Sequence, residues 1–135
     1  MRPSFVDPIL KNPGAAWELR NLRNARVLAS RIETAFDSAT RRKGLLGRSS
    51  LAEGAALIIA PCNSIHTFFM RFPLDAAFVA RDGAIVSLSH AVLPWRIRLA
   101  LRAFAVVELP SGTLEHLDTR VGDALRLTAS ELSRA

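Results

Sequence analysis

Cysteine is nearly missing from this chain, because Cys62 is the single cysteine among 135 residues. A lone cysteine excludes a disulfide bond within the chain, so the fold has to be held by its core and its hydrogen bonds. Half of the residues are hydrophobic, and a chain near this length buries roughly 68–70% of its unfolded surface. The composition therefore predicts a single domain in a reducing compartment, for which we expect the cytoplasm.

Long apolar runs are also missing. The longest run, Ala55–Ala60, is far shorter than the roughly 20 residues that a membrane-spanning helix needs. The first residues contain Pro3, Pro8 and Pro13 among charged side chains, and they lack the apolar core of a secretion signal. We expect a soluble, monomeric protein without a transmembrane segment.

The short motifs that mark several large enzyme classes are absent as well. The chain contains no GxSxG, HExxH, Walker or dinucleotide-binding motif. These absences remove the commonest sequence evidence for a hydrolase, a zinc protease or a nucleotide-dependent enzyme. We therefore favour a protein without catalytic activity, and we expect no cofactor.

Acidic residues are scarce in the first fifty positions, where ten lysines and arginines accompany only four carboxylates. These positions carry the whole net charge of +6, since the remainder holds eight basic and eight acidic residues. A basic first third is suited to nucleic acid or another acidic partner. Only two of the 18 basic residues are lysines, so an arginine-rich solvated surface is the simpler explanation. Association with nucleic acid is kept as an alternative function.

Prolines divide the chain into an N-terminal arm and one domain. Residues 1–25 contain three of the seven prolines and show no clear periodicity, so we expect a partly ordered arm. Within it, residues 15–24 are predicted to form a short helical turn that carries Trp17. Residues 26–135 are predicted to form a single β-rich domain.

Within this domain, turn signals separate short apolar runs at intervals of about ten residues. Asp37 can cap a helix and Gly44 can end it, which predicts one helix near residues 37–47. The Asp82-Gly83 pair lies between two apolar runs and predicts a β-hairpin. The pattern indicates a mainly β (α+β) fold, either a small closed β-barrel or a sandwich of short strands with this one helix.

Residues 62–75, CNSIHTFFMRFPLD, place the single cysteine, a histidine, an arginine and an aspartate close together in an aromatic, apolar segment. On an extended strand, Cys62, His66 and Met70 would share one face. A mixture of donors, acceptors and an aromatic ring suits a small polar or anionic ligand. We therefore expect a non-catalytic module that binds a ligand or a protein partner, with the candidate ligand-binding residues His66, Met70, Arg71, Asp75, Trp95, Arg96 and Glu108.

Three other interpretations of the same residues stay open. His66 has the chemistry of a general base, with Asp75 or Glu108 to orient it, as in a hydrolase. Cys62, His66 and Met70 have the chemistry of ligands for a soft metal ion such as Cu(I). Residues four apart on a strand lie about 13 Å apart, which is too far for three bonds to one ion unless the chain bends, so no metal site is predicted. The side chains could also support the fold alone, with Arg71 and Asp75 as an ion pair.

Several motifs resemble the uncharacterised family known as domain of unknown function 192, DUF-192. The resemblance spans Arg26 to Leu127, about three-quarters of the chain, and implies a compact β-rich domain without an established activity. It also implies that five of the candidate residues share a face, namely His66, Met70, Arg71, Asp75 and Glu108. The matching motifs are RKGLLGR at 42–48, HTFFMRFPLD at 66–75, the Asp82-Gly83 turn, LPWR at 93–96, VELPSG at 107–112 and VGD at 121–123.

Overall fold

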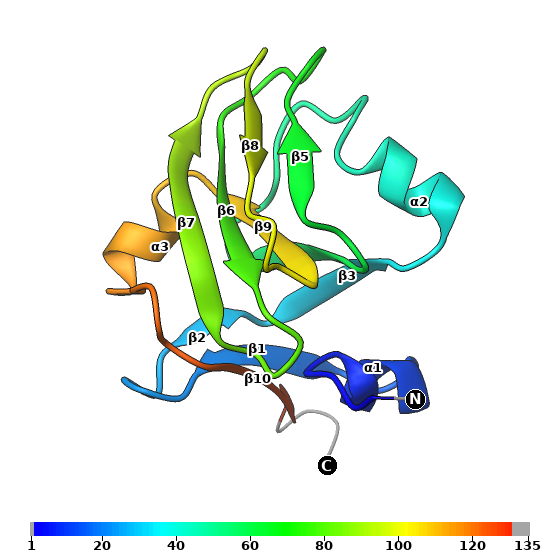
Figure 1. Cartoon of the computed structure of the whole chain (residues 1–135), viewed down its shortest axis with the longest axis vertical. Coiled ribbons are helices and arrows are strands. Elements are labelled where there is room, and N and C mark those ends of the chain that lie inside the picture. Colours follow the sequence, from blue (N-terminus) through cyan, green and yellow to red (C-terminus); the bar gives the residue numbers. More distant parts are fainter. Residues whose placement is uncertain (1, 131–135) are drawn as a thin grey trace.

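Strands arranged in three sheets are the main regular structure of the computed structural model, which describes residues 2–130 (Figure 1). The largest sheet has five strands, in the spatial order β3 (Arg31–Ala35), β4 (Ala55–Ile59), β9 (Ala105–Pro110), β6 (Leu74–Val79) and β7 (Ile85–Val92). Strand β3 is parallel to β4, and the other neighbours are antiparallel. The parallel pair is joined through helix α2 (Ser38–Lys43), because parallel neighbours need a crossover connection.

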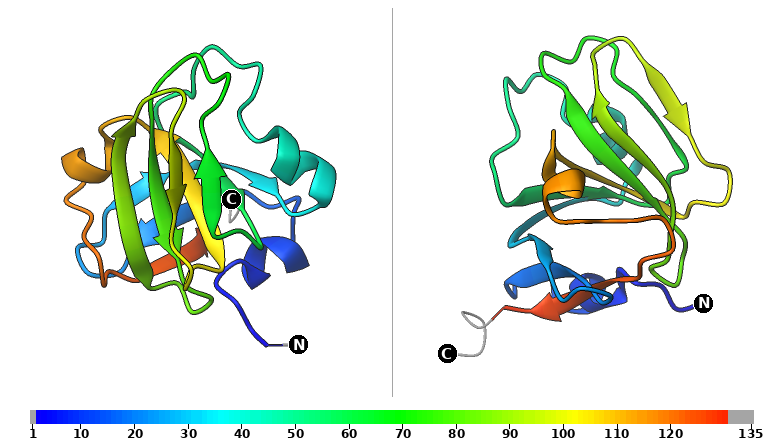
Figure 2. Two further views of the ribbon diagram at one scale, coloured as in Figure 1. Left: turned by 45° about the horizontal axis from the view of Figure 1, so that its top comes forward. Right: turned by 90° about the vertical axis from the view of Figure 1, so that its left-hand side faces the viewer.

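Two smaller sheets lie on either side of the five-stranded sheet (Figure 2). One has three strands, in the order β10 (Leu125–Ala129), β1 (Trp17–Asn21) and β2 (Val27–Ala29). The other is an antiparallel ribbon of two short strands, β5 (Ser64–His66) and β8 (Ile97–Leu99). The ribbon stands apart from the three-stranded sheet, near the top of the molecule in Figure 1.

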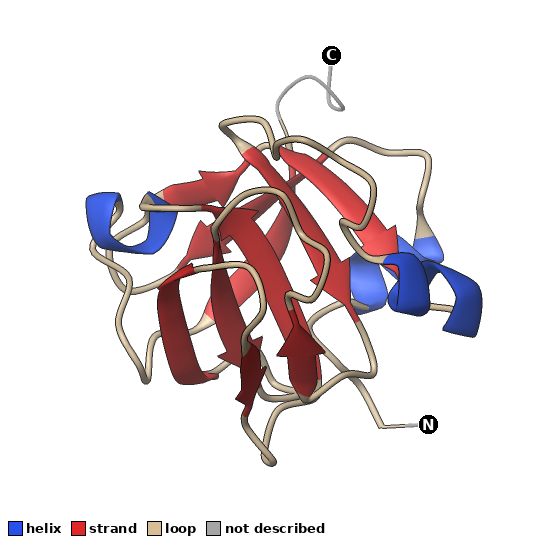
Figure 3. Cartoon of the chain, turned by 90° about the horizontal axis from the view of Figure 1, so that it is seen from above, coloured by secondary structure: helices blue, strands red, loops and turns tan. Residues whose placement is uncertain are grey.

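The mainly β prediction is confirmed, but the sheets within residues 2–130 do not close into a barrel. Strands β3 and β7 are the two edges of the five-stranded sheet, and they do not pair with each other. The arrangement is therefore layered, which is the sandwich alternative rather than the closed one. Figure 3 shows the strands and the short helices from above.

Three short helices occur in the described part of the chain, where the sequence predicts one. The predicted helix is α2, in which the Asp37 side chain accepts a hydrogen bond from the Thr40 N–H at 2.8 Å and Gly44 ends the helix. The two helices that were not predicted are α1 (Asp7–Lys11) and α3 (Thr113–His116). None of these helices approaches the length needed to cross a membrane.

The Asp82-Gly83 hairpin is confirmed as the turn between β6 and β7. Gly83 has φ +97°, and a Cβ atom there would lie 2.4 Å from the Leu125 carbonyl oxygen. The turn thus requires glycine for its conformation and for the close approach of the β10 backbone.

The three central strands of the five-stranded sheet, β4, β9 and β6, are buried on both faces. Successive side chains of β9 alternate, so Val107 and Leu109 enter the core shared with the three-stranded sheet. Val106 points to the opposite face, into a second core formed with residues after α2 and with Ile65. Glu108 shares the face of Val106, and its carboxyl group is therefore directed toward the side of α2 and β5.

Residues 1–25 pack against this framework. Phe5, Val6 and Ile9 are buried in the core beside the three-stranded sheet. The helical turn predicted for residues 15–24 is wrong, because residues 17–21 form β1 and pair with β10 along their whole length. The alternating burial of this segment, with Leu19 and Asn21 inside, has the period of a strand rather than of a helix.

Candidate functional site

A sharp bend at Thr67 divides the segment that the sequence predicts as one strand. Strand β5 ends at His66, and the buried Thr67 hydroxyl donates a hydrogen bond to the Leu93 carbonyl oxygen at 2.7 Å. The same hydroxyl accepts a hydrogen bond from the Arg96 N–H at 2.8 Å. The loop after β5 is thereby joined to the loop before β8, and Met70 turns back into the core beside Ile65.

We expect Thr67→Val to destabilise the protein by about 1–3 kcal/mol, because the isosteric side chain removes both hydroxyl hydrogen bonds from a buried position. Urea unfolding measures the loss, and hydrogen exchange should show faster exchange at the Arg96 amide. Thr34→Val is the matched control, since Thr34 is exposed on β3. Equal stabilities for the two variants would contradict the role of the Thr67 hydroxyl.

An open pocket of about 200 Å³ lies between α2, β5 and the five-stranded sheet. Side chains from distant parts of the sequence meet in it, including three that were predicted as ligand-binding residues. These are His66, Met70 and Glu108. Further polar groups and backbone in its lining come from the end of α2, from Cys62 before β5 and from the first residue of β5, namely Arg41, Arg42, Lys43, Gly44, Cys62 and Ser64.

Glu108 projects from β9 into the buried side of this pocket. Its side chain is 5% exposed, and no residue within 2–130 donates a hydrogen bond to its carboxyl group. A Cβ atom at Gly44 would lie 3.9 Å from Glu108 Oε1, so the backbone after α2 passes close to the carboxyl. Burial raises the pKa of Glu108 to about 7, although the charge of Arg48 acts in the opposite direction.

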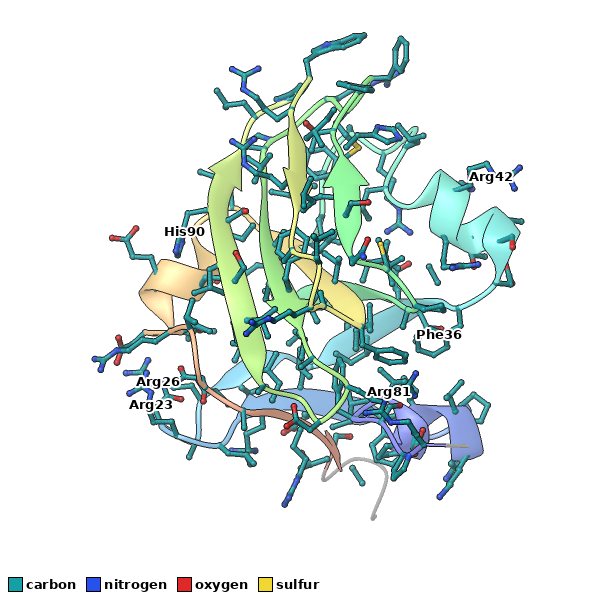
Figure 4. All side chains as sticks on the ribbon, in the orientation of Figure 1. Arg23, Arg26, Phe36, Arg42, Arg81 and His90 are labelled. Carbon is teal, nitrogen blue, oxygen red and sulfur yellow. The ribbon has the colours of Figure 1, made fainter. Side chains whose placement is uncertain are left out.

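The outer edge of the pocket is basic. Arg41 is engaged in the fold, because its guanidinium donates a hydrogen bond to the Pro61 carbonyl oxygen at 2.9 Å. Arg42 and Lys43 are exposed, and the described residues provide neither with a carboxylate partner. Figure 4 shows Arg42 on the α2 side of the molecule, opposite Arg23 and Arg26. The pocket thus has the Glu108 carboxyl in its interior and positively charged side chains, Arg42 and Lys43, at its rim.

Cys62 and His66 bring a thiol and an imidazole to the lining of the pocket. Burial raises the pKa of the Cys62 thiol, and Sγ donates to the Ser64 carbonyl oxygen at 3.0 Å. His66 is exposed and stacks on Phe68, with ring centroids 4.9 Å apart. Within residues 2–130, no cluster of three histidine, cysteine or carboxylate side chains could hold a metal ion.

Asp75 lies on the other face of the sheet from Glu108. In the pairing of β6 with β9, Asp75 is opposite Leu109, whereas Ala76 is opposite Glu108. The fully buried Asp75 carboxylate accepts hydrogen bonds from the Ala91 N–H at 2.8 Å and from the Leu114 N–H at 3.0 Å. The expectation of one shared face is therefore wrong for Asp75, which links β6 to β7 and to the start of α3.

The remaining candidate residues are exposed and lie outside the pocket lining. Trp95 contacts Phe69 edge to face, with ring centroids 4.7 Å apart. Among residues 2–130, the Arg96 guanidinium donates only to the nearby Pro94 and Trp95 carbonyl oxygens. Arg71 forms no ion pair with Asp75 among the residues described.

The sequence-based site missed the contribution of α2. Arg42, Lys43 and Gly44 line the pocket although they lie more than sixty positions before Glu108. In the sequence these three residues belong to the RKGLLGR motif, which is part of the family resemblance. In the sequence-based prediction this segment serves only to place the end of a helix. Composition and spacing contain no information that would pair this motif with β9.

The fold and the pocket define a small layered β-sheet protein with a candidate binding site between a helix end and a two-stranded ribbon. A family model, DUF192, described as "Uncharacterized ACR", matches residues 20–127, and the chain belongs to this family. A UPF0127 protein from Thermococcus sibiricus is 28% identical over 113 residues, which are 79% of this chain and 72% of that protein. A UPF0127 protein from Pyrococcus furiosus is 38% identical over 63 residues, 46% of this chain and 53% of the other.

Two crystal structures share the fold. One is of a Sinorhizobium meliloti protein, provisionally called a transcription regulator, with a TM-score of 0.71 and 24% identity. The match covers 85% of this chain and 92% of that one. The other is of a protein of unknown function from Novosphingobium aromaticivorans, with a TM-score of 0.71, 23% identity, and coverage of 82% and 83%. At these identities the likeness establishes the fold alone.

Proposed function

We propose that the protein is a non-catalytic binding module for a small molecule that carries both an amino group and an anionic group. The observation that carries this proposal is the Glu108 carboxyl, which faces an open pocket from a residue that is only 5% exposed and which accepts no hydrogen bond from the described residues. The enclosed side-chain oxygens that lack a partner in residues 2–130 belong to Thr119 and Ser130. The Glu108 oxygens reach the open pocket instead, where they can accept a hydrogen bond from a ligand.

The charges around the pocket favour this ligand chemistry. An ammonium group next to Glu108 would compensate for the burial that raises its pKa to about 7. An anionic group on the same molecule would lie at the rim, where Arg42 and Lys43 are exposed. The pocket volume of about 200 Å³ limits the ligand to a few heavy atoms within the pocket.

O-Phosphoethanolamine is a suitable probe, with ethanolamine and ethyl phosphate as its two halves. Calorimetric titration at pH 8 should show that the whole probe binds more tightly than either half. Glu108→Gln and Arg42→Gln should each weaken binding by roughly tenfold, the effect of losing one charge-assisted contact. Binding should also strengthen from pH 6 to pH 8, because Glu108 ionises in this range.

Arg26→Gln is the matched control, since Arg26 is exposed and lies on the opposite side of the molecule from Arg42 (Figure 4). This variant should bind as the wild type does. Met70 lines the pocket, so its methyl resonance reports whether the probe enters. Binding that leaves this resonance unchanged, or that is insensitive to Glu108→Gln, would refute the proposal.

A further inference from the structure

A separate group of large apolar side chains is exposed around the β5–β8 ribbon. Phe69 is 72% exposed, Trp95 56% and Leu101 79%. We call this group the tip patch, and its members are Phe69, Leu93, Trp95, Ile97, Leu99 and Leu101. Single exposed apolar residues are common on protein surfaces, but a contiguous set marks an interaction surface.

The ribbon presents this patch through its pairing register. Ile97 is opposite His66, and Leu99 is opposite Ser64, so these side chains share the outward face of the ribbon. Ile65 lies on the inward face and is buried. Ile97 and Leu99 are therefore directed away from the core by the strand alternation itself.

The aromatic side chains of the patch are held in place. Phe69 and Trp95 have φ values of +65° and +68°, a region that residues other than glycine and asparagine rarely adopt. Hydrogen bonds that Thr67 donates and accepts join their two loops, and in one of them the Trp95 N–H donates to the Thr67 carbonyl oxygen at 2.9 Å. The backbone thus keeps two large rings at the surface instead of turning them inward.

The segments that build the patch carry basic side chains and no acidic ones. The two segments that build it, residues 62–72 and 91–104, contain no aspartate or glutamate. They contain four exposed arginines, and none of these takes part in an ion pair with another residue of the described chain. The arginines are Arg71, Arg96, Arg98 and Arg102.

We propose that the tip patch docks on the surface of a membrane that contains anionic phospholipids. Tryptophan, phenylalanine and leucine side chains insert at the boundary between lipid headgroups and acyl chains. Arginine guanidinium groups bind lipid phosphates, while the aliphatic part of the side chain lies along the apolar layer. The ribbon and the loops that flank it supply each of these parts: Ile97 and Leu99 lie on β8, and Phe69, Trp95 and Arg96 lie in the loops. This proposal is independent of the Glu108 pocket.

Two other occupants fit the patch less well. A second copy of the chain would bring like-charged arginines together, and the patch offers no carboxylate to pair with them. A nucleic acid would use the arginines but would gain little from Leu93, Ile97, Leu99 and Leu101. The rings of Phe69 and Trp95 already contact each other edge to face, which leaves a poor platform for base stacking.

The test uses the full chain with Trp17→Phe, which leaves Trp95 as the only tryptophan. Vesicles consist of phosphatidylcholine alone or with about 30% phosphatidylglycerol, which sets the anionic charge. The protein should float with the anionic vesicles only, and the Trp95 emission should shift to shorter wavelength. Neither lipid carries a primary amine, so the Glu108 pocket does not contribute to this binding.

Variants separate the apolar from the charged contribution. The pair Ile97→Ser and Leu99→Ser should weaken vesicle binding by roughly tenfold or more, because each buried aliphatic side chain contributes about that factor. The pair Arg96→Gln and Arg98→Gln should weaken it and flatten its salt dependence. Val121→Ser, at an exposed apolar residue outside the patch, is the matched control and should leave binding unchanged.

Three results would overturn the proposal. The first is the absence of flotation and of an emission shift with anionic vesicles. The second is self-association that the Ile97→Ser and Leu99→Ser pair abolishes, because the patch would then be an interface between copies. The third is saturable binding of single-stranded RNA or DNA that displaces the protein from vesicles and depends on Trp95.

Discussion

Glu108→Gln should make the protein more stable than the wild type at pH 9 by roughly 3 kcal/mol, since each unit of pKa corresponds to about 1.4 kcal/mol. Burial raises the pKa of Glu108 from its ordinary value of 4.5 to about 7. Below pH 4.5 the carboxyl is neutral in both the folded and the unfolded protein, so its burial adds no charge. Above pH 7 the folded protein holds a buried carboxylate, and wild-type stability falls as pH rises between these values.

Urea unfolding at pH 5, 7 and 9 measures this effect. The free-energy difference between Glu108→Gln and the wild type should be smallest at pH 5 and should grow toward pH 9. Glu115→Gln is the control, because Glu115 is an exposed carboxylate on α3. A difference that does not change with pH would show that Glu108 is ionised at an ordinary pKa in the folded protein.

Asp75→Ala should destabilise the protein by about 3–5 kcal/mol, because two backbone N–H groups would lose a charged acceptor inside the protein. The total stability of a domain is commonly about 5–15 kcal/mol, so this loss is large. Asp75→Asn should not restore it. The amide can accept from one N–H, but its NH₂ group would then face the other donor, either that of Ala91 or that of Leu114.

Asp82→Ala provides the comparison for Asp75. Asp82 also accepts a backbone hydrogen bond, from the Ala84 N–H at 3.0 Å, but its side chain is exposed. Its loss should cost about 1 kcal/mol or less. Any folded fraction of Asp75→Asn should still bind O-phosphoethanolamine, since Asp75 faces away from the pocket. An Asp75 variant that is stable but has lost binding would contradict the structural role.

The sequence alone predicted the local features of the fold correctly where the backbone conformation depends on only a few neighbouring residues. Helix α2 begins after Asp37, whose side chain caps it, and ends at Gly44, which adopts a positive φ. Asp82 and Gly83 define the β6–β7 hairpin for similar reasons. These features depend on side chains within a few positions, and the sequence contains all of the information required.

The site could be predicted only in part, because it depends on register and on contacts between distant segments. His66, Met70 and Glu108 do line one pocket, but Asp75 points to the other side of the sheet. Composition does not fix which residue of β6 lies opposite which residue of β9. The bend at Thr67 is likewise imposed by partners nearly thirty positions away, so the expected straight strand through Met70 does not form.

The most direct test of a ligand pocket built around Glu108 is the titration of its carboxyl carbon by ¹³C NMR, with and without O-phosphoethanolamine. The free protein should titrate with a midpoint of about 7. The bound ammonium group should stabilise the carboxylate and lower this midpoint, with Met70 methyl shifts following the same saturation curve. A midpoint near 4.5 that the probe does not change would contradict both the electrostatics of the pocket and its proposed function.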